Sequence, residues 1–68
     1  LDGISEIRKI IKKSSELIKN GGKLVLEIAY NQKEEVKLLL KKNNFYINSV
    51  VRDLAKNERC IISTKTKK

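Results

Sequence analysis

The sequence predicts a small α/β unit whose elements follow the order helix, strand, helix, strand, strand. Apolar residues recur at helical spacing over residues 1–20 and again over residues 31–44. Three short segments rich in apolar and β-branched residues lie between or after these helices, at 24–29, 47–54 and 59–64. Two helices and three strands in this order indicate an α/β fold.

The first helix is predicted over residues 1–20. Asp2 is the expected N-cap, because its carboxylate can accept hydrogen bonds from the first backbone N–H groups. Gly21 or Gly22 is expected to adopt the left-handed conformation that ends the helix. The apolar stripe consists of Ile4, Ile7, Ile11 and Ile18, with Ile10 and Leu17 beside them.

The first strand is predicted over residues 24–29, with Glu27 as the only charged side chain. A buried carboxylate costs on the order of several kcal/mol unless it is paired. We therefore expect Glu27 to lie near the end of the strand, or to meet Arg52, Arg59 or a backbone donor. Alternation places Leu24, Leu26 and Ile28 on one face and Val25, Glu27 and Ala29 on the other.

The second helix is predicted to begin at Asn31, with Glu34 completing a capping box. The asparagines at 43–44 are expected to end it, and Phe45 or Tyr46 to pack back onto its end. The inward stripe is Val36, Leu39 and Leu40, flanked by Leu38, while Lys33, Lys37 and Lys41 form a solvated line.

Residues 47–54 and 59–64 are predicted to form an antiparallel hairpin, because residues 55–58 suffice for its loop. The first strand, its helix and the second strand form a right-handed βαβ unit with parallel strands. Three strands and two helices leave sheet surface uncovered, so we expect a missing part of the domain. Residues 65–68 form a basic tail or linker.

Several site classes are disfavoured by the sequence. Cys60 is the only cysteine and histidine is absent, so neither a disulfide, a zinc cluster nor a Cys–His nucleophile is predicted. The glycines of Gly21-Gly22-Lys23 follow a helix and precede a strand, whereas a phosphate loop precedes a helix. The acids Glu27, Asp53 and Glu58 have no evident partner for acid–base catalysis.

The net charge of +8 favours a second hypothesis, a small basic module that contacts RNA through its lysines. A/T-rich codons explain part of this lysine excess, since isoleucine and asparagine are abundant too. A third hypothesis is a chain that folds only with a missing segment or with a copy of itself. No signal peptide or membrane span is predicted, so a cytoplasmic location without membrane contact is expected.

Several blocks of residues carry a resemblance to a known family. They are Asp2-Gly3-Ile4, the run from Gly21 to Tyr30, Gln32, Asn44-Phe45, Arg52-Asp53-Leu54-Ala55 and Asn57-Glu58-Arg59. With these blocks, residues 1–64 resemble the C-terminal portion of the peptide-release-factor glutamine methyltransferases, the HemK/PrmC family. Ala29 departs from the pattern, because relatives usually carry glycine there.

The resemblance implies a class I S-adenosylmethionine-dependent methyltransferase. Its Rossmann-like sheet of seven strands places the last strand antiparallel between its two predecessors, and the apolar centre at residues 60–62 suits such a middle strand. The parent enzyme would methylate the side-chain amide of a glutamine in release factors. Some relatives carry a second, tRNA-modifying methyltransferase.

The family's cofactor loop and substrate motif precede the matched region. We therefore assign no catalytic, cofactor-binding or metal-binding residue to this chain, and expect an inactive scaffold that does not bind S-adenosylmethionine alone. The landmarks Glu27, Gln32, Asp53 and Arg59 are expected to support structure. An ion pair of Arg59 with Glu27 or Asp53 is one hypothesis for such support.

Overall fold

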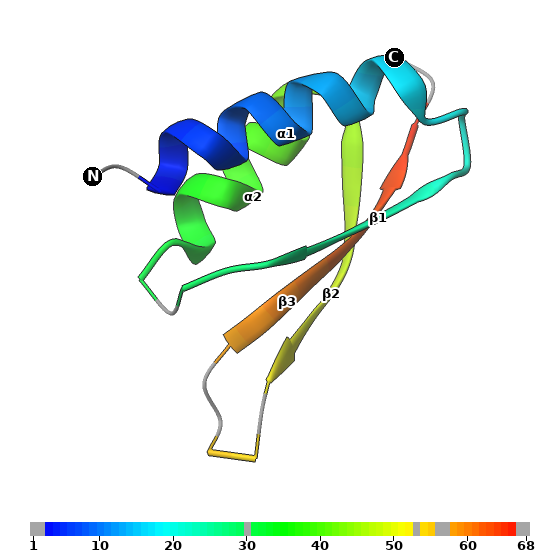
Figure 1. Cartoon of the computed structure of the whole chain (residues 1–68). Helices are drawn as coiled ribbons and strands as arrows, with labels where there is room; N and C mark the ends of the chain where they lie inside the picture. Colours follow the sequence, from blue (N-terminus) through cyan, green and yellow to red (C-terminus); the bar gives the residue numbers. More distant parts are fainter. Residues whose placement is uncertain (1–2, 30, 53, 56–57, 67–68) are drawn as a thin grey trace.

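A computed structural model describes residues 3–29, 31–52, 54–55 and 58–66 of the chain. The predicted order of elements is confirmed (Figure 1). The elements are α1 (Gly3–Leu17), β1 (Lys23–Glu27), α2 (Lys33–Lys42), β2 (Phe45–Arg52) and β3 (Glu58–Lys65). No helix in these segments is long and apolar enough to cross a membrane.

The three strands form one sheet in the order β1-β3-β2, and β3 is antiparallel to both neighbours. The last strand therefore lies in the middle, as the sequence predicts. Neither outer strand hydrogen-bonds to the other, and both depend on β3 for their pairing. A β-bulge interrupts the pairing of β2 between Ile47 and Ser49, and a second irregularity follows Val51.

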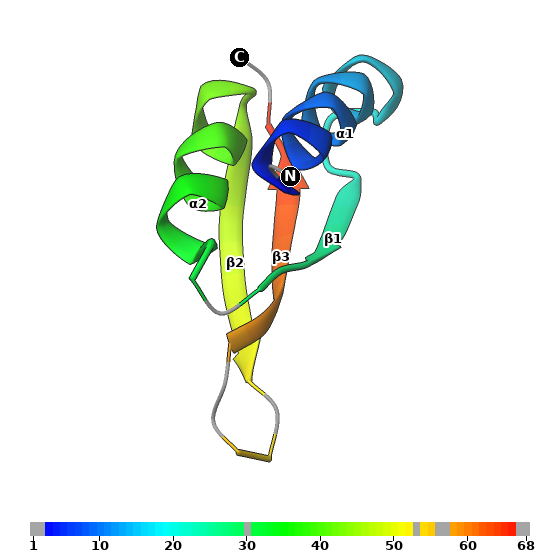
Figure 2. The same ribbon diagram turned by 60° about the vertical axis from the view of Figure 1, so that its left-hand side comes forward.

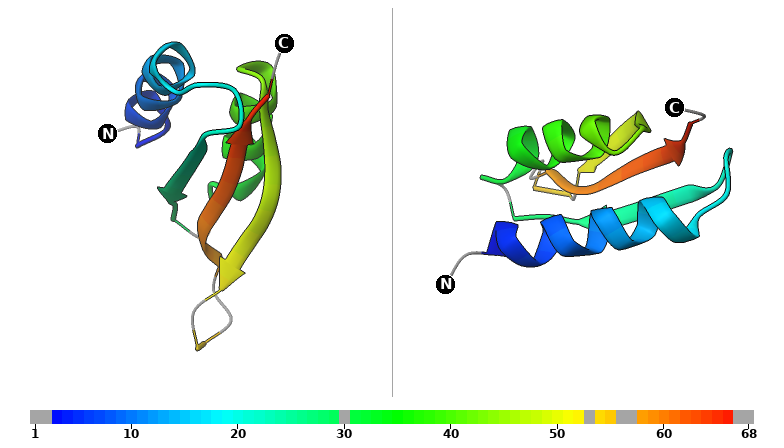
Figure 3. Two further views of the ribbon diagram at one scale, coloured as in Figure 1. Left: turned by 90° about the vertical axis from the view of Figure 1, so that its right-hand side faces the viewer. Right: turned by 90° about the horizontal axis from the view of Figure 1, so that it is seen from above.

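Both helices lie on the same side of the sheet, above it in Figure 1, and Figure 2 shows α2 beside β2 and α1 over β3 and β1. The view from above places α1 along β1 and α2 along β2 (Figure 3). One core joins the helices to the covered face of the sheet, and Ile11, Val36, Leu40 and Ile61 in it are fully inaccessible to solvent. The remaining core residues are Ile4, Leu26, Ile28 and Phe45.

The glycine pair after α1 has two distinct roles. Gly21 adopts the left-handed conformation, with φ of 88°, and this confirms the predicted helix end. Gly22 lies so close to α1 that a Cβ atom there would come within 2.5 Å of Ile18 Cγ2. Gly21 donates to the carbonyl oxygen of Lys65 at 2.7 Å, which extends the β1–β3 ladder. Asp2, the predicted N-cap of this helix, lies outside the described residues.

The predicted capping box of the second helix is wrong. The N-cap of α2 is Gln32, and α2 itself begins at Lys33. Gln32 makes no side-chain cap. Instead, its Oε1 atom accepts the backbone N–H of Ala29 at 2.9 Å, while its own N–H donates to the Ala29 carbonyl at 2.9 Å. This turn delays the helix beyond Asn31. At the other end, Asn44 has φ of 67°, which confirms the predicted asparagine cap.

The strand boundaries differ from the prediction by one or two residues. The second strand begins at Phe45 rather than Ile47, because Phe45 is buried in the core and stands opposite Lys65 in the register of β2 and β3. Lys65, predicted to begin the tail, is the last residue of β3. Thr66 then donates to the Asn44 carbonyl at 2.8 Å, so the ordered ladder extends past residue 64.

Candidate interface on the uncovered face of the sheet

Neither of the described helices lies over the second face of the sheet, and we call it the uncovered face. Cross-strand partners point to the same side of a sheet, so the pairing register identifies its residues. Three rows cross the strands in the order β1, β3, β2. The rows are Lys23, Thr64 and Tyr46, then Val25, Ile62 and Ser49, and finally Glu27, Cys60 and Val51.

The first row is polar and internally hydrogen-bonded. The Lys23 ammonium group donates to Thr64 Oγ1 at 2.9 Å. The Thr64 hydroxyl donates in turn to Asn48 Oδ1 at 2.6 Å, and Asn48 lies at the bulge of β2. Side chains from all three strands are therefore joined by hydrogen bonds at this end of the uncovered face.

The centre of the uncovered face is apolar and accessible. Val25 is 58% exposed and Val51 is 43% exposed, and Ile62, in the same row as Val25, is half-buried. On the covered face the neighbouring Ser63 is fully buried, and its hydroxyl donates to the Leu24 carbonyl at 3.0 Å. A cluster of accessible β-branched side chains on a sheet is typical of a surface that another layer covers.

The predicted landmarks that the structure describes are Glu27, Gln32 and Arg59. Glu27 is exposed at the end of β1, as predicted, and forms no ion pair with another described residue, so its pairing with Arg59 is not observed. The carbonyl of Arg59 accepts the backbone N–H of Ile28 at 2.8 Å. Gln32 closes the turn before α2. Asp53 lies outside the described residues. The Arg59 carbonyl and Gln32 thus bond to two adjacent residues just after β1, Ile28 and Ala29.

Chemical sites are sparse in the part of the chain that the structure describes. No group of three or more histidine, cysteine, aspartate or glutamate side chains lies close enough to hold a metal ion there. Cys60 is a free, half-buried thiol on the uncovered face. The assignment of no catalytic, cofactor-binding or metal-binding residue stays a prediction.

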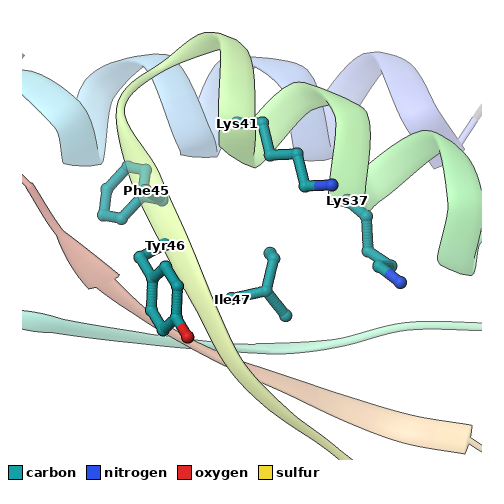
Figure 4. Close-up of a pocket in the computed structure, with 5 residues that line it drawn as sticks. All are labelled: Lys37, Lys41, Phe45, Tyr46 and Ile47. Atoms are coloured by element: carbon teal, nitrogen blue, oxygen red, sulfur yellow. The ribbon is translucent and has the colours of Figure 1, made fainter.

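A feature that the sequence did not predict is a concavity of about 360 Å³ between α2 and the start of β2 (Figure 4). Its lining residues are Lys37, Lys41, Phe45, Tyr46 and Ile47. The four-residue spacing of the two lysines could have indicated a shared helix face. Only the structure reveals that this face overlooks the outer edge of β2.

Comparison with known sequences finds relatives of nearly the whole chain. The chain is 42% identical over 64 residues to a release factor glutamine methyltransferase of Fusobacterium nucleatum, and the match spans 94% of this chain and 18% of that protein. A release factor glutamine methyltransferase of Buchnera aphidicola is 38% identical over 94% of this chain. The predicted family resemblance is confirmed. A bifunctional methyltransferase of Rickettsia felis, 36% identical over 90% of this chain, is a further relative.

The alignment covers only part of each relative. The chain spans 18% of the Fusobacterium protein, 23% of the Buchnera protein and 12% of the Rickettsia protein. No family model and no solved structure matches the chain. Nearly the whole chain is thus similar to one portion of the release factor glutamine methyltransferase family, in agreement with the C-terminal portion that the sequence predicts.

Proposed function

We propose that this chain is the C-terminal portion of an enzyme that transfers a methyl group from S-adenosylmethionine to a glutamine side chain of peptide chain release factors. The names of its Fusobacterium and Buchnera relatives support this activity and this substrate. Since the chain spans about a fifth of those proteins, the remainder of the domain supplies the cofactor and substrate sites.

The uncovered face carries the structural part of this proposal. In α/β domains, helices usually cover both faces of the sheet, so that both faces are buried. Here both helices cover one side, and Val25, Ile62 and Val51 lie accessible on the other. In the proposed parent, the three strands form one end of a Rossmann-like class I sheet, and the preceding part of the domain packs over the uncovered face.

The chain acts in this proposal as a scaffold without reactive groups of its own. Residues 1–64 belong to the methyltransferase domain and residues 65–68 lead out of it, although Lys65 still pairs in β3. Alone, the chain neither binds S-adenosylmethionine nor transfers methyl groups. The parent acts in the cytoplasm, where release factors work, and has no contact with the membrane.

Reconstitution from two pieces tests this proposal. The Fusobacterium relative is truncated to remove the segment that matches this chain, and the two polypeptides are produced together. We expect them to copurify, and the complex to methylate a release factor with labelled S-adenosylmethionine while each piece alone is inactive. Isothermal titration of the 68-residue chain with S-adenosylmethionine should show no heat of binding.

Matched variants locate the contact. Ile62→Asp places a charge at the centre of the uncovered face and should abolish copurification. Lys13→Asp on the exposed side of α1 should leave it intact. Binding of S-adenosylmethionine by the chain alone would show that the cofactor site lies in this chain and not in the remainder of the domain. Failure of the two polypeptides to associate would contradict the scaffold role.

The small RNA-binding module remains the second candidate, and the net charge of +8 is the observation that favours it. RNA-binding modules often stack bases on accessible aromatic rings, but Phe45 is only 3% exposed and is therefore unavailable for base stacking. The module predicts that the association constant for an RNA oligonucleotide falls steeply with salt, with a slope set by several phosphate contacts. A salt titration by fluorescence anisotropy measures that slope.

A further inference from the structure

Two cations overlook the concavity between α2 and β2. Lys37 and Lys41 lie one helical turn apart on α2, and in Figure 4 Ile47 points from β2 toward them. The ring of Tyr46 points to the opposite side of the strand, in agreement with its place on the uncovered face. The wall and rim of the concavity are thus apolar at Ile47 and positively charged along α2.

No negative charge in the described residues neutralises this pair of lysines. Of the two acids in the first turn of α2, Glu34 pairs with Lys33 at 3.7 Å, and Glu35 lines a different concavity. Strand β2, with the sequence FYINSVVR, contains no acidic residue. None of the ion pairs formed among the described side chains includes Lys37 or Lys41. The concavity therefore carries two positive charges that attract an anionic group.

The floor of the concavity is an unpaired strand edge. Among the residues that the structure describes, strand β2 pairs on one side only, with β3. The carbonyl of Asn44 accepts the N–H of Thr66, so this residue faces β3. Because inward and outward backbone groups alternate along an antiparallel strand, Phe45 and Ile47 direct their N–H and C=O groups to the free edge. Such groups are available to an added strand.

We propose that this edge binds an extended, acidic segment of a partner protein as an added strand. Side chains two residues apart in a strand are separated by about 6.6 Å. Lysines four residues apart on a helix are separated by about 6 Å along the axis. Since α2 runs alongside β2 (Figure 2), alternate carboxylates of the segment meet Lys37 and Lys41 in turn.

The same observations argue against a nucleic-acid strand in this position. Single-stranded RNA is bound by accessible aromatic rings beside cations. Here the ring of Phe45 is buried in the core, which leaves Tyr46, with its ring turned away from Ile47, as the one accessible ring among the lining residues. The unpaired N–H and C=O groups instead match a peptide backbone. This inference does not rest on the proposed methyltransferase function, because it uses a surface of the chain itself.

The test is a titration of the isotope-labelled 68-residue chain with a blocked seven-residue peptide of alternating glutamate and valine, followed by backbone amide shifts. We expect the shifts to concentrate at residues 37–47. The same peptide with alternate backbone nitrogens methylated should not bind, because it cannot form the ladder. Lys37→Glu combined with Lys41→Glu should weaken binding at least about tenfold.

A matched double variant distinguishes a site from general attraction. Lys13→Glu with Lys19→Glu makes the same change in net charge at exposed positions that do not line the concavity, and should weaken binding less than about threefold. Equal losses in the two double variants would overturn the proposal, as would full binding of the methylated peptide. If oligouridylate bound at residues 37–47 more tightly than the acidic peptide, the proposal would be overturned and the ligand of this site would be a nucleic acid.

Discussion

Lys23 and Thr64 are joined across two strands, with the lysine ammonium nitrogen 2.9 Å from the threonine Oγ1 atom. An ammonium group only donates, so the hydroxyl is left to donate to Asn48 Oδ1, 2.6 Å away. These contacts tie β1, β3 and β2 together at the bulge, where the regular pairing is interrupted. They therefore support the register at the polar end of the uncovered face.

Replacing Thr64 with valine should cost the chain little. Valine keeps the shape and the strand preference but removes both hydrogen bonds, each worth about 1 kcal/mol or less at an accessible site. We expect the free energy of unfolding to fall by less than about 1.5 kcal/mol in urea denaturation. Ser15→Ala, which removes one exposed hydrogen bond within α1, is the control. A loss above about 3 kcal/mol would contradict this account, because it would show that the two hydrogen bonds of Thr64 are essential to the stability of the fold.

Ile61 and Ile62 are adjacent in β3 but should respond oppositely to truncation. Ile61 is fully buried beneath the helices, and Ile61→Ala should cost about 2–5 kcal/mol. A domain of this size has only about 3–5 kcal/mol in total, so this variant should be largely unfolded by circular dichroism. Ile62→Ala on the uncovered face should unfold near the wild-type urea midpoint. It should instead weaken association with the truncated Fusobacterium relative.

The two glycines after α1 should tolerate alanine differently. Gly21→Ala forces a left-handed alanine and should cost about 1 kcal/mol. Gly22→Ala should cost more, because its Cβ would meet Ile18 Cγ2 at 2.5 Å and the Lys19 carbonyl oxygen at 3.0 Å. A synthetic chain with D-alanine at position 21 should recover the loss, and thermal unfolding checks all three. A synthetic D-alanine variant less stable than Gly21→Ala would contradict this account.

Gln32 rather than Asn31 should stabilise the start of α2. Gln32→Ala removes the acceptor for the Ala29 N–H and should lower the free energy of unfolding by about 1 kcal/mol. Gln32→Glu retains an acceptor oxygen and should therefore keep most of the stability that Gln32→Ala loses. Asn31→Ala should change it by less than about 0.5 kcal/mol, because Asn31 does not cap the helix. Hydrogen exchange at Ala29 reports the contact directly. Equal losses of stability in Gln32→Ala and Asn31→Ala would instead support the capping box predicted at Asn31.

Local sequence rules predicted the order of the elements and several of their ends. The glycines and asparagines after the helices were correct signals because left-handed backbone restricts residue choice so strongly. The alternation over residues 24–29 also predicted the covered and uncovered sides of β1. The central position of β3, by contrast, came from the family resemblance, together with the apolar residues 60–62.

The rest depended on contacts that spacing does not reveal. The capping box failed because Gln32 reaches back to Ala29 and displaces the helix start. The second strand began early because Phe45 is buried in the core, a tertiary contact that no local pattern measures. The bulge at Asn48 and the cationic concavity at Lys37 and Lys41 depend on how β2 pairs and on what lies above it.

The position of β3 in the sheet also affects when this unit can fold during synthesis. A ribosome makes β1 and β2 first, yet each finds its backbone partner only in β3, which emerges after both. The nascent chain therefore exposes two unpaired strands until translation has passed Lys65. A stop codon introduced just before Glu58 would leave both without a ladder, and a protease should degrade that truncated polypeptide rapidly.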